Sequence, residues 1–253
     1  MIDTMLVIPD QHAHPDHDNS RADLLARLTI DLNPDVVINM GDAADMNAIS
    51  SYDKGSRSFV GKTYKKDIDA HLDFQSRWWD PVKARKRKLP HRVFLEGNHE
   101  HRIERVLDMH HELEGSIGFK DLDLDRYYDE IVRYNGSNPG IYNIGGVNFA
   151  HYFVAGISGR PTSGDSPARL MINKFGDTSI QAHNHLFDHA TRKNVFGRRF
   201  HAMTVGCYQD YINDWAGQSG NYWVSGVLVL RGVENGDFGH QWIPLEHLKK
   251  EYS

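Results

Sequence analysis

Cysteine, basic residues and long apolar runs are all scarce in this sequence, and each shortage excludes a class of protein. Cys207 is the only cysteine, so no disulfide can form within the chain, which suits a reducing compartment. No stretch approaches the roughly 18 apolar residues of a membrane span, and the first residues lack the basic n-region of a signal peptide. The formal net charge is −5, whereas dedicated nucleic-acid binders are usually basic. We therefore expect a cytoplasmic protein that does not enter a membrane.

The length and composition indicate one large globular domain. The chain has 253 residues, of which 40% are apolar and 25% are charged, the profile of a protein with a substantial core. No linker, internal repeat or low-complexity tract divides it, so we expect a single domain over residues 1–253. The abundant residue is histidine, with 16 copies, many of them in tight groups with Asp or Asn. Histidine is the commonest metal ligand and acid–base group.

The first half of the chain alternates between buried strands and amphipathic helices. Apolar runs predict strands at 4–9, 35–40 and 91–96, and helical spacing predicts helices at 22–32, 65–88, from about 100 onward, and 124–132. A strand–helix–strand order favours parallel strands in one sheet.

The second half is dominated by strands. A hairpin is predicted around Gly145-Gly146, followed by strands at 178–182, 200–205, 223–230 and 240–245. We therefore expect an α/β protein with two sheets packed face to face and helices covering the outer faces.

One basic run, KARKRK from Lys83 to Lys88, has two interpretations. It could form a nucleic-acid patch, but cations are also favoured at the end of a helix and face solvent there. We favour the second interpretation.

Polar residues follow five of the predicted strands, where ligand crevices form in α/β sheets. They are Asp10 and His12, then Asp42 and Asp45, then Asn98 and His99, then His151, and finally His183 and His185. Residues two apart on an extended chain point the same way, so each Asp-x-His or His-x-His pair can bind one ion. Gly41 and Gly97 allow tight turns next to an ion.

The mixture of oxygen and nitrogen ligands narrows the choice of metal. It suits Mn²⁺, Fe, Ni²⁺ or Zn²⁺ better than Ca²⁺ or a thiolate-held zinc. Because the set exceeds the four ligands of one tetrahedral zinc, we expect two divalent metal ions, with Mn²⁺ as the first choice.

The motifs D-x-H, G-D-x-x-D, G-N-H-E, a single His and x-H-x-H, in this order, resemble the calcineurin-like metallophosphoesterase superfamily. The resemblance spans Asp10 to His185 and implies a four-layer α–β–β–α sandwich that hydrolyses phosphate esters. The compact length looks most like the small phosphoesterases of bacteria and bacteriophages, which would place it in a host cytoplasm if phage-encoded. Because only 68 residues follow His185, we expect no separate capping domain.

The resemblance also implies a role for each motif residue. Asp42 bridges two metals, and a hydroxide between them attacks phosphorus. His99 is a non-ligand histidine that protonates the leaving group or stabilises charge on the phosphoryl group, and Asp45 orients it. The first metal is held by Asp10, His12 and His185, and the second by Asn98, His151 and His183.

Some positions depart from the family or stand outside its motifs. Ala182 replaces the usual Gly, and Met46-Asn47 replaces the Arg-Gly of the protein Ser/Thr phosphatases, so a phosphoprotein substrate is not expected.

The remaining candidates are substrate contacts. Asn98 and His14 are expected to meet the substrate, and Arg160 in the loop 156–169 to grip a phosphate, although a solvated loop arginine is an equal alternative. Arg102 follows His99 closely and could also meet the phosphate, or it could instead pair with Glu100. Four aromatic residues could form a wall for a base, although core packing or an interface is the expected use: Tyr208, Tyr211, Trp215 and Trp223.

The leading hypothesis is a phosphodiesterase acting on a nucleotide or a nucleic acid. The main alternative is a phosphomonoesterase, which needs extra positive charge beside the metals to hold a dianionic phosphate. A non-catalytic binding module is a remote alternative, since His99 and every ligand position are present.

Overall fold

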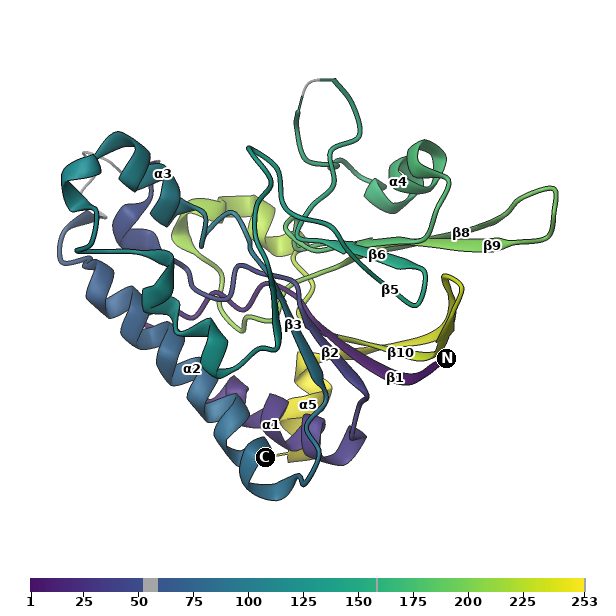
Figure 1. Cartoon of the computed structure of the whole chain (residues 1–253), viewed down its shortest axis with the longest axis horizontal. Helices are drawn as coiled ribbons and strands as arrows, with labels where there is room; N and C mark the ends of the chain where they lie inside the picture. The colour runs from purple at the N-terminus through teal and green to yellow at the C-terminus, as the bar shows by residue number, and fades with distance from the viewer. Residues whose placement is uncertain (52–58, 158, 253) are drawn as a thin grey trace.

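Two β-sheets form the centre of the molecule, and the computed structural model describes residues 1–51, 59–157 and 159–252. The larger sheet has six strands, in the order β11 (Asp237–Pro244), β10 (Gly226–Glu234), β1 (Ile2–Ile8), β2 (Val36–Asn39), β3 (His91–Leu95) and β4 (Glu130–Val132). The smaller sheet has five, in the order β5 (Tyr142–Ile144), β6 (Val147–Ala150), β7 (Ser179–Gln181), β9 (Arg199–Val205) and β8 (Phe187–Lys193). Figure 1 shows the smaller sheet lying over the larger one.

The strands that carry the motifs run parallel within each sheet. In the larger sheet β1, β2, β3 and β4 are parallel, and β10 joins β1 in the antiparallel sense. In the smaller sheet β6, β7 and β9 are parallel. The expected parallel pairing of the first two strands is therefore confirmed.

The alternating side chains of β1 show why the sheets stack. Leu6 and Ile8 pack into the cluster beneath the helices, whereas Met5 and Val7 pack into the cluster between the two sheets. Alternate residues of a strand point to opposite faces, so a strand buried on both faces reads as a continuous apolar run.

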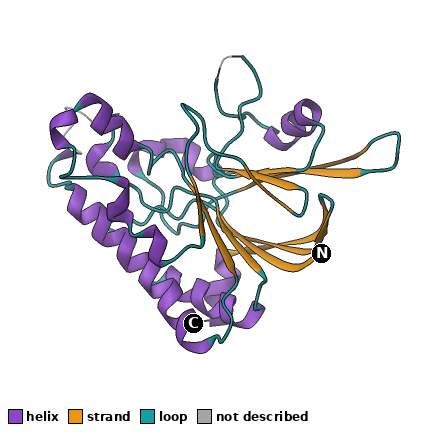
Figure 2. Cartoon of the chain, in the orientation of Figure 1, coloured by secondary structure: helices purple, strands orange, loops and turns teal. Residues whose placement is uncertain are grey.

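Helices cover both outer faces. Helices α1 (Arg21–Leu32), α2 (Tyr64–Arg85) and α5 (Leu245–Tyr252) pack on the larger sheet, and α4 (Pro167–Phe175) packs on the smaller one. Figure 2 shows the resulting order of helices, sheet, sheet and helix. The predicted α–β–β–α sandwich is confirmed. None of the described helices is both long and apolar enough to cross a membrane.

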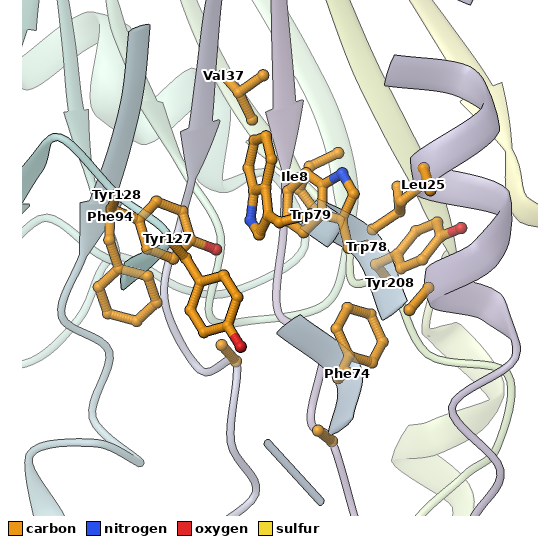
Figure 3. Packing of buried hydrophobic residues seen from close by; sticks show 14 of the residues in the cluster. Ile8, Leu25, Val37, Phe74, Trp78, Trp79, Phe94, Tyr127, Tyr128 and Tyr208 are labelled. Carbon is orange, nitrogen blue, oxygen red and sulfur yellow. The ribbon is translucent and has the colours of Figure 1, made fainter. Parts of the chain in front are cut away.

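Two adjacent tryptophans anchor α2 to the larger sheet. Trp78 and Trp79 are fully buried, and their rings stack with centroids 4.4 Å apart. Figure 3 shows them among Ile8, Val37 and Leu25. Replacing a buried aromatic residue of this size by alanine typically costs about 3–5 kcal/mol.

The basic run begins inside the last turn of α2. The helix ends at Arg85, and the Lys83 ammonium donates to the carbonyl of Arg126. Cations at this end of a helix are favoured by its dipole, in line with the solvent-facing interpretation.

The helix expected over 124–132 is wrong. A 3₁₀ turn at η5 (Leu124–Arg126) is followed by strand β4, whose residue Glu130 pairs with Val93 of β3. The segment is short, and pairing with a neighbouring strand overrides its local helical spacing.

Other elements lie outside the sequence expectations. Helix α4 forms within a segment interpreted as loop, the polar strand β8 pairs with β9 along its length, and α5 follows β11. The remaining helical segments are α3 (Arg102–Met109) and the 3₁₀ turns η1 (Asn47–Ile49), η3 (His111–Leu113), η4 (Phe119–Leu122) and η6 (Asp214–Tyr222).

Candidate metal centre

The five motif segments meet at one edge of the two sheets. Each begins within a few residues of the end of a parallel strand: β1, β2 and β3 in the larger sheet and β6 and β7 in the smaller one. The junction between the sheets is direct, since the backbone N–H of His183 donates to Asp10 Oδ2 across 2.9 Å.

The first cluster joins Asp10, His12 and His185, all of them buried. Nε2 of His185 lies 3.0 Å from Asp10 Oδ2 and 3.2 Å from Nε2 of His12. Three ligand atoms this close together can share one ion.

The second cluster joins Asp42, His151 and His183. Nε2 of His151 lies 3.3 Å from Asp42 Oδ2, 3.3 Å from Nδ1 of His183 and 2.9 Å from Oδ1 of Asn98. Asp42 Oδ2 is also 3.9 Å from Nε2 of His12. Asp42 therefore lies between the two clusters, within 4 Å of a histidine nitrogen from each.

The donor atoms of the second cluster fit a cation. Nδ1 of His151 donates to the Met40 carbonyl across 2.9 Å, so Nε2 would present a lone pair once the ring has given up its second proton. Nε2 faces the carboxylate of Asp42 and the amide oxygen of Asn98. A divalent ion bound by these atoms would replace that second proton. In the first cluster, Asp10 Oδ1 is buried with no hydrogen-bond partner among the described residues, which is also expected of a ligand atom.

The electrostatics of the clusters favour positive charge. Burial lowers the pKa of His151, but the carboxylates of Asp42 and Asp10 outweigh it and raise the pKa to about 9. Burial likewise raises the pKa of the Asp42 carboxyl, yet His151 and His99 hold it well below its usual range. Both groups therefore sit where a buried cation is stabilised.

The ligand segments adopt strained backbone. Four of the motif residues have positive φ angles: 45° at His12, 48° at Asp42, 69° at His183 and 58° at His185. Non-glycine residues seldom occupy this left-handed region, and such strain concentrates at functional sites.

Two glycines make room for this geometry. A Cβ at Gly97 would lie 2.2 Å from Asp42 Oδ1, and a Cβ at Gly41 would lie 2.6 Å from the backbone nitrogen of Gly97. Glu100 then ties the two loops together, because its carboxylate accepts from the backbone N–H groups of Asp42, Ala44 and Gly97.

Asp45 contacts other histidines besides His99. Its Oδ1 lies 2.9 Å from Nδ1 of His12 and 3.5 Å from Nδ1 of His99. The closest partner of His99 Nδ1 is instead the backbone carbonyl of Asp45, at 2.6 Å. The Asp45 carboxylate therefore fixes the ring of a candidate metal ligand as well as bordering His99, a second partner that the sequence does not indicate.

Arg102 lies beside His99. The alternative in which it pairs with Glu100 is wrong: Nη2 of Arg102 lies 2.9 Å from Nε2 of His99, and Nη1 donates to the carbonyls of Asp45 and Met46. The spacing of three residues from His99 at the start of a helix could have revealed it, because residues three apart on a helix are neighbours.

The candidate substrate contacts differ in their surroundings. His14 is mostly buried, with Nε2 3.6 Å from Asp45 Oδ2, and Asn98 lies within the second cluster. Arg160 is exposed, and it forms no ion pair with any residue that the structure describes. The arrangement thus brings His14 and Asn98 to the centre, whereas the exposed Arg160 has no described contact with it.

The four aromatic residues separate into different roles. Tyr208 is fully buried in the core beneath the helices, while Tyr211 and Trp223 contact the motif segments. The side chain of Trp215 lies outside the described part of the structure.

Comparison with known proteins agrees with this geometry. A family model described as calcineurin-like phosphoesterase matches residues 4–240, a span that contains all five motifs. No curated protein sequence matches the chain at a significant level. The family and the Asp/His clusters fit a dinuclear divalent metal site and an enzyme that hydrolyses phosphoric esters. The chain belongs to the calcineurin-like phosphoesterase family.

Proposed function

We propose that this protein is a phosphodiesterase with two metals, preferably Mn²⁺, and that it acts on nucleotide or nucleic-acid diesters. The observation that carries the proposal is the position of Asp42 between two clusters of ligand atoms. In this account Asp10, His12 and His185 hold one ion, Asn98, His151 and His183 hold the other, and Asp42 serves both.

The metals supply the electrophilic part of the chemistry. When bound, two divalent cations would lower the pKa of a coordinated water and would offset negative charge on the phosphoryl oxygens.

The residues of the chain orient the substrate and move the proton. Because Nδ1 of His99 is engaged by the Asp45 carbonyl, the proton for the leaving oxygen has to be carried on Nε2, which requires Nη2 of Arg102 to release its contact with that nitrogen. Asp45 holds the rings of His12 and His99, and Asn98 and His14 border the position of the phosphoryl group.

The preference for diesters is supported by the state of Arg102. A dianionic monoester is best held by an arginine that offers two parallel N–H groups. The Nη1 and Nη2 groups of Arg102 already donate to the carbonyls of Asp45 and Met46 and to His99. A diester carries one negative charge fewer and depends less on such a clamp.

A monoesterase is the second candidate, and the same residue favours it. Arg102 lies beside His99, so release of its two carbonyl contacts would make a phosphate clamp available.

The two candidates are separated by a direct comparison of substrates. Hydrolysis of bis(p-nitrophenyl) phosphate and of p-nitrophenyl phosphate should be measured at one pH with saturating Mn²⁺. The proposal requires the larger kcat/KM for the diester, and a clear preference for the monoester would replace it with the phosphatase. Single-stranded and duplex DNA, RNA and cyclic nucleotides extend the panel. Small diesters and strand ends are expected to be better substrates than long duplex, because the net charge of −5 disfavours binding to duplex phosphates.

We also propose that residues 1–253 form one domain without a separate cap, of the small type found in bacteria and bacteriophages, and that it acts in the cytoplasm. The support is that segments from β1 to α5 contribute to one pair of sheets and their covering helices. Limited proteolysis tests this: one protected core is expected, whereas two stable fragments would contradict it.

A further inference from the structure

A cavity of about 550 Å³ adjoins the candidate metal centre and has no role in the account so far. Its walls come from residues 209–212, from Gly220 at the end of η6 with Trp223 and Ser225 after it, and from the start of α5. This volume lies within the range of small-molecule sites, roughly 300–1,000 Å³.

The strand pairing places this cavity at the same edge of the sheet as the metal ligands. Strand β10 is antiparallel to β1, with Leu228 opposite Val7, so the start of β10 lies beside the end of β1. The backbone N–H of Tyr208 donates to the carbonyl of Asp10 across 2.7 Å. The segment that lines the cavity therefore runs directly alongside a candidate metal ligand.

Two aromatic residues of the cavity wall touch the ligand segments. The Tyr211 hydroxyl donates to the carbonyl of His12, and its ring stacks on His17 with centroids 3.7 Å apart. The ring of Trp223 meets that of His185 edge-on, with centroids 4.3 Å apart. The aromatic part of the cavity wall therefore contacts two of the candidate metal ligands.

Gln209 supplies an unused hydrogen-bond acceptor. The residue is 2% exposed, and its Nε2 donates to the carbonyl of Tyr211 across 2.9 Å, which fixes the orientation of the amide. Its Oε1 is buried without a partner among the described residues. An unsatisfied buried acceptor costs about 1–3 kcal/mol, so an N–H donor from a ligand would be stabilising here.

The charges around the cavity are balanced. Asp210 lies 3.7 Å from Nη1 of Arg21 and 3.4 Å from Nζ of Lys249, and Glu246 lies 3.3 Å from the same lysine nitrogen. Two carboxylates facing two cations give no strong preference for an ammonium or an anion. A neutral ligand with N–H donors and a flat apolar face fits best.

We propose that this cavity binds the base of the substrate, a nucleobase with an exocyclic amino group: adenine, cytosine or guanine. The amino group donates to Oε1 of Gln209, and the ring lies against Trp223, since every base can stack on an aromatic side chain. The assignment rests on the proposed function, because it takes the phosphate to be held at the metal centre.

Binding of nucleosides to metal-free protein tests the assignment without any hydrolysis. By calorimetry, adenosine, cytidine and guanosine should bind, and uridine, whose exocyclic groups are both acceptors, should bind about 3–10-fold more weakly. Gln209→Met should abolish this discrimination. Ile212→Trp, at an exposed lining position, should lower the affinity for all nucleosides at least ~10-fold. Ile141→Trp, at a similarly exposed isoleucine in a different cavity, is the matched control and should leave the affinity for each nucleoside unchanged.

Each negative result of these binding experiments leads to a different conclusion. Absence of nucleoside binding at millimolar concentration, equal binding of uridine, or full binding by Ile212→Trp would each overturn the base site. If Gln209→Met does not fold, the nucleoside comparison and Ile212→Trp still decide the question. Hydrolysis of bis(p-nitrophenyl) phosphate by the metal-loaded wild type is measured separately, so loss of the base site and loss of the proposed function are distinguishable.

Discussion

Arg102 donates from Nη2 to Nε2 of His99 across 2.9 Å, while Nδ1 of the same ring is bonded to the Asp45 carbonyl. The ring is thus held at both nitrogens, and Nε2, which lies 3.8 Å from Asp42 Oδ2, has a fixed positive charge beside it. His99 and Arg102 are expected to act on the substrate as one unit.

The first prediction follows from this coupling. With a diester that has an alkyl leaving group, His99→Ala and Arg102→Ala should each lower kcat by ~10²-fold. The double variant should lose at most about a further 10-fold in kcat, because the effects of groups that act as a unit are strongly non-additive. Metal content should stay unchanged in all three. Arg105→Ala, at an exposed arginine on the same helix, is the control. Losses that multiply to ~10⁴-fold would show that the two residues act independently.

The second prediction concerns the leaving group. If Nε2 of His99 delivers a proton, His99→Ala should cost ~10²-fold or more with an alkyl leaving group and far less with nitrophenolate, which needs little protonation. Asp45→Asn should show a milder form of the same pattern, since Asp45 borders His99 and holds His12. Rate constants across a series of aryl and alkyl diesters decide this. An equal loss across the series would leave charge stabilisation as the role of His99.

The third prediction uses the close approach of two loops. Gly97→Ala should displace Asp42, because the added Cβ would lie 2.2 Å from its Oδ1, and the metal content should fall below two ions per chain. Gly156→Ala is the control, since a Cβ there has no atom within 4 Å. Elemental analysis after gel filtration gives the answer. A Gly97→Ala protein with two ions and normal turnover would contradict the site geometry.

The fourth prediction concerns pH. Burial, opposed by the hydrogen bond from the Ala48 N–H and reinforced by the charge of Asp45, raises the pKa of Asp67 from 3.8 to about 6. The folded state therefore holds this proton more tightly than the unfolded chain does. The stability that this proton provides is complete below about pH 4 and is lost as the pH rises through about 6.

Asp67→Asn should remove that dependence. The variant should exceed wild type in unfolding free energy by roughly 2–4 kcal/mol at pH 8 and differ little at pH 3.5. Urea titrations of metal-free protein at the two pH values measure it. Asp69→Asn, at an exposed position of the same helix, is the control. An Asp67→Asn variant that is less stable than wild type at pH 8 would refute the raised pKa of Asp67.

Much of the fold could be predicted from the sequence because burial on both faces leaves a clear signature. The runs at β1, β2 and β3 are apolar at consecutive positions, and each is followed within a few residues by Asp, Asn or His. The order of these segments therefore indicated which side chains would meet. Strand β4 and helix α4 were missed or misassigned because they are short, so tertiary pairing decides their conformation rather than local spacing.

The contacts within the centre were less predictable. That Asp45 reaches His12 depends on how the loops after β1 and β2 meet at the end of the sheet. These loops contain positive φ angles at His12 and Asp42, which no periodicity reveals.

The central claim, that Asp42 joins two metal sites into one catalytic unit, is tested most directly by titration of metal-free protein with Mn²⁺. Bound metal and hydrolysis of bis(p-nitrophenyl) phosphate are followed together in wild type and in Asp42→Ala, with Asp108→Ala, at an exposed aspartate, as the control. The account predicts that wild type and Asp108→Ala bind two ions per chain and that turnover rises with the second. It predicts that Asp42→Ala retains fewer than two ions and no measurable turnover. Full activity at one ion per chain, or two ions and normal turnover in Asp42→Ala, would contradict it.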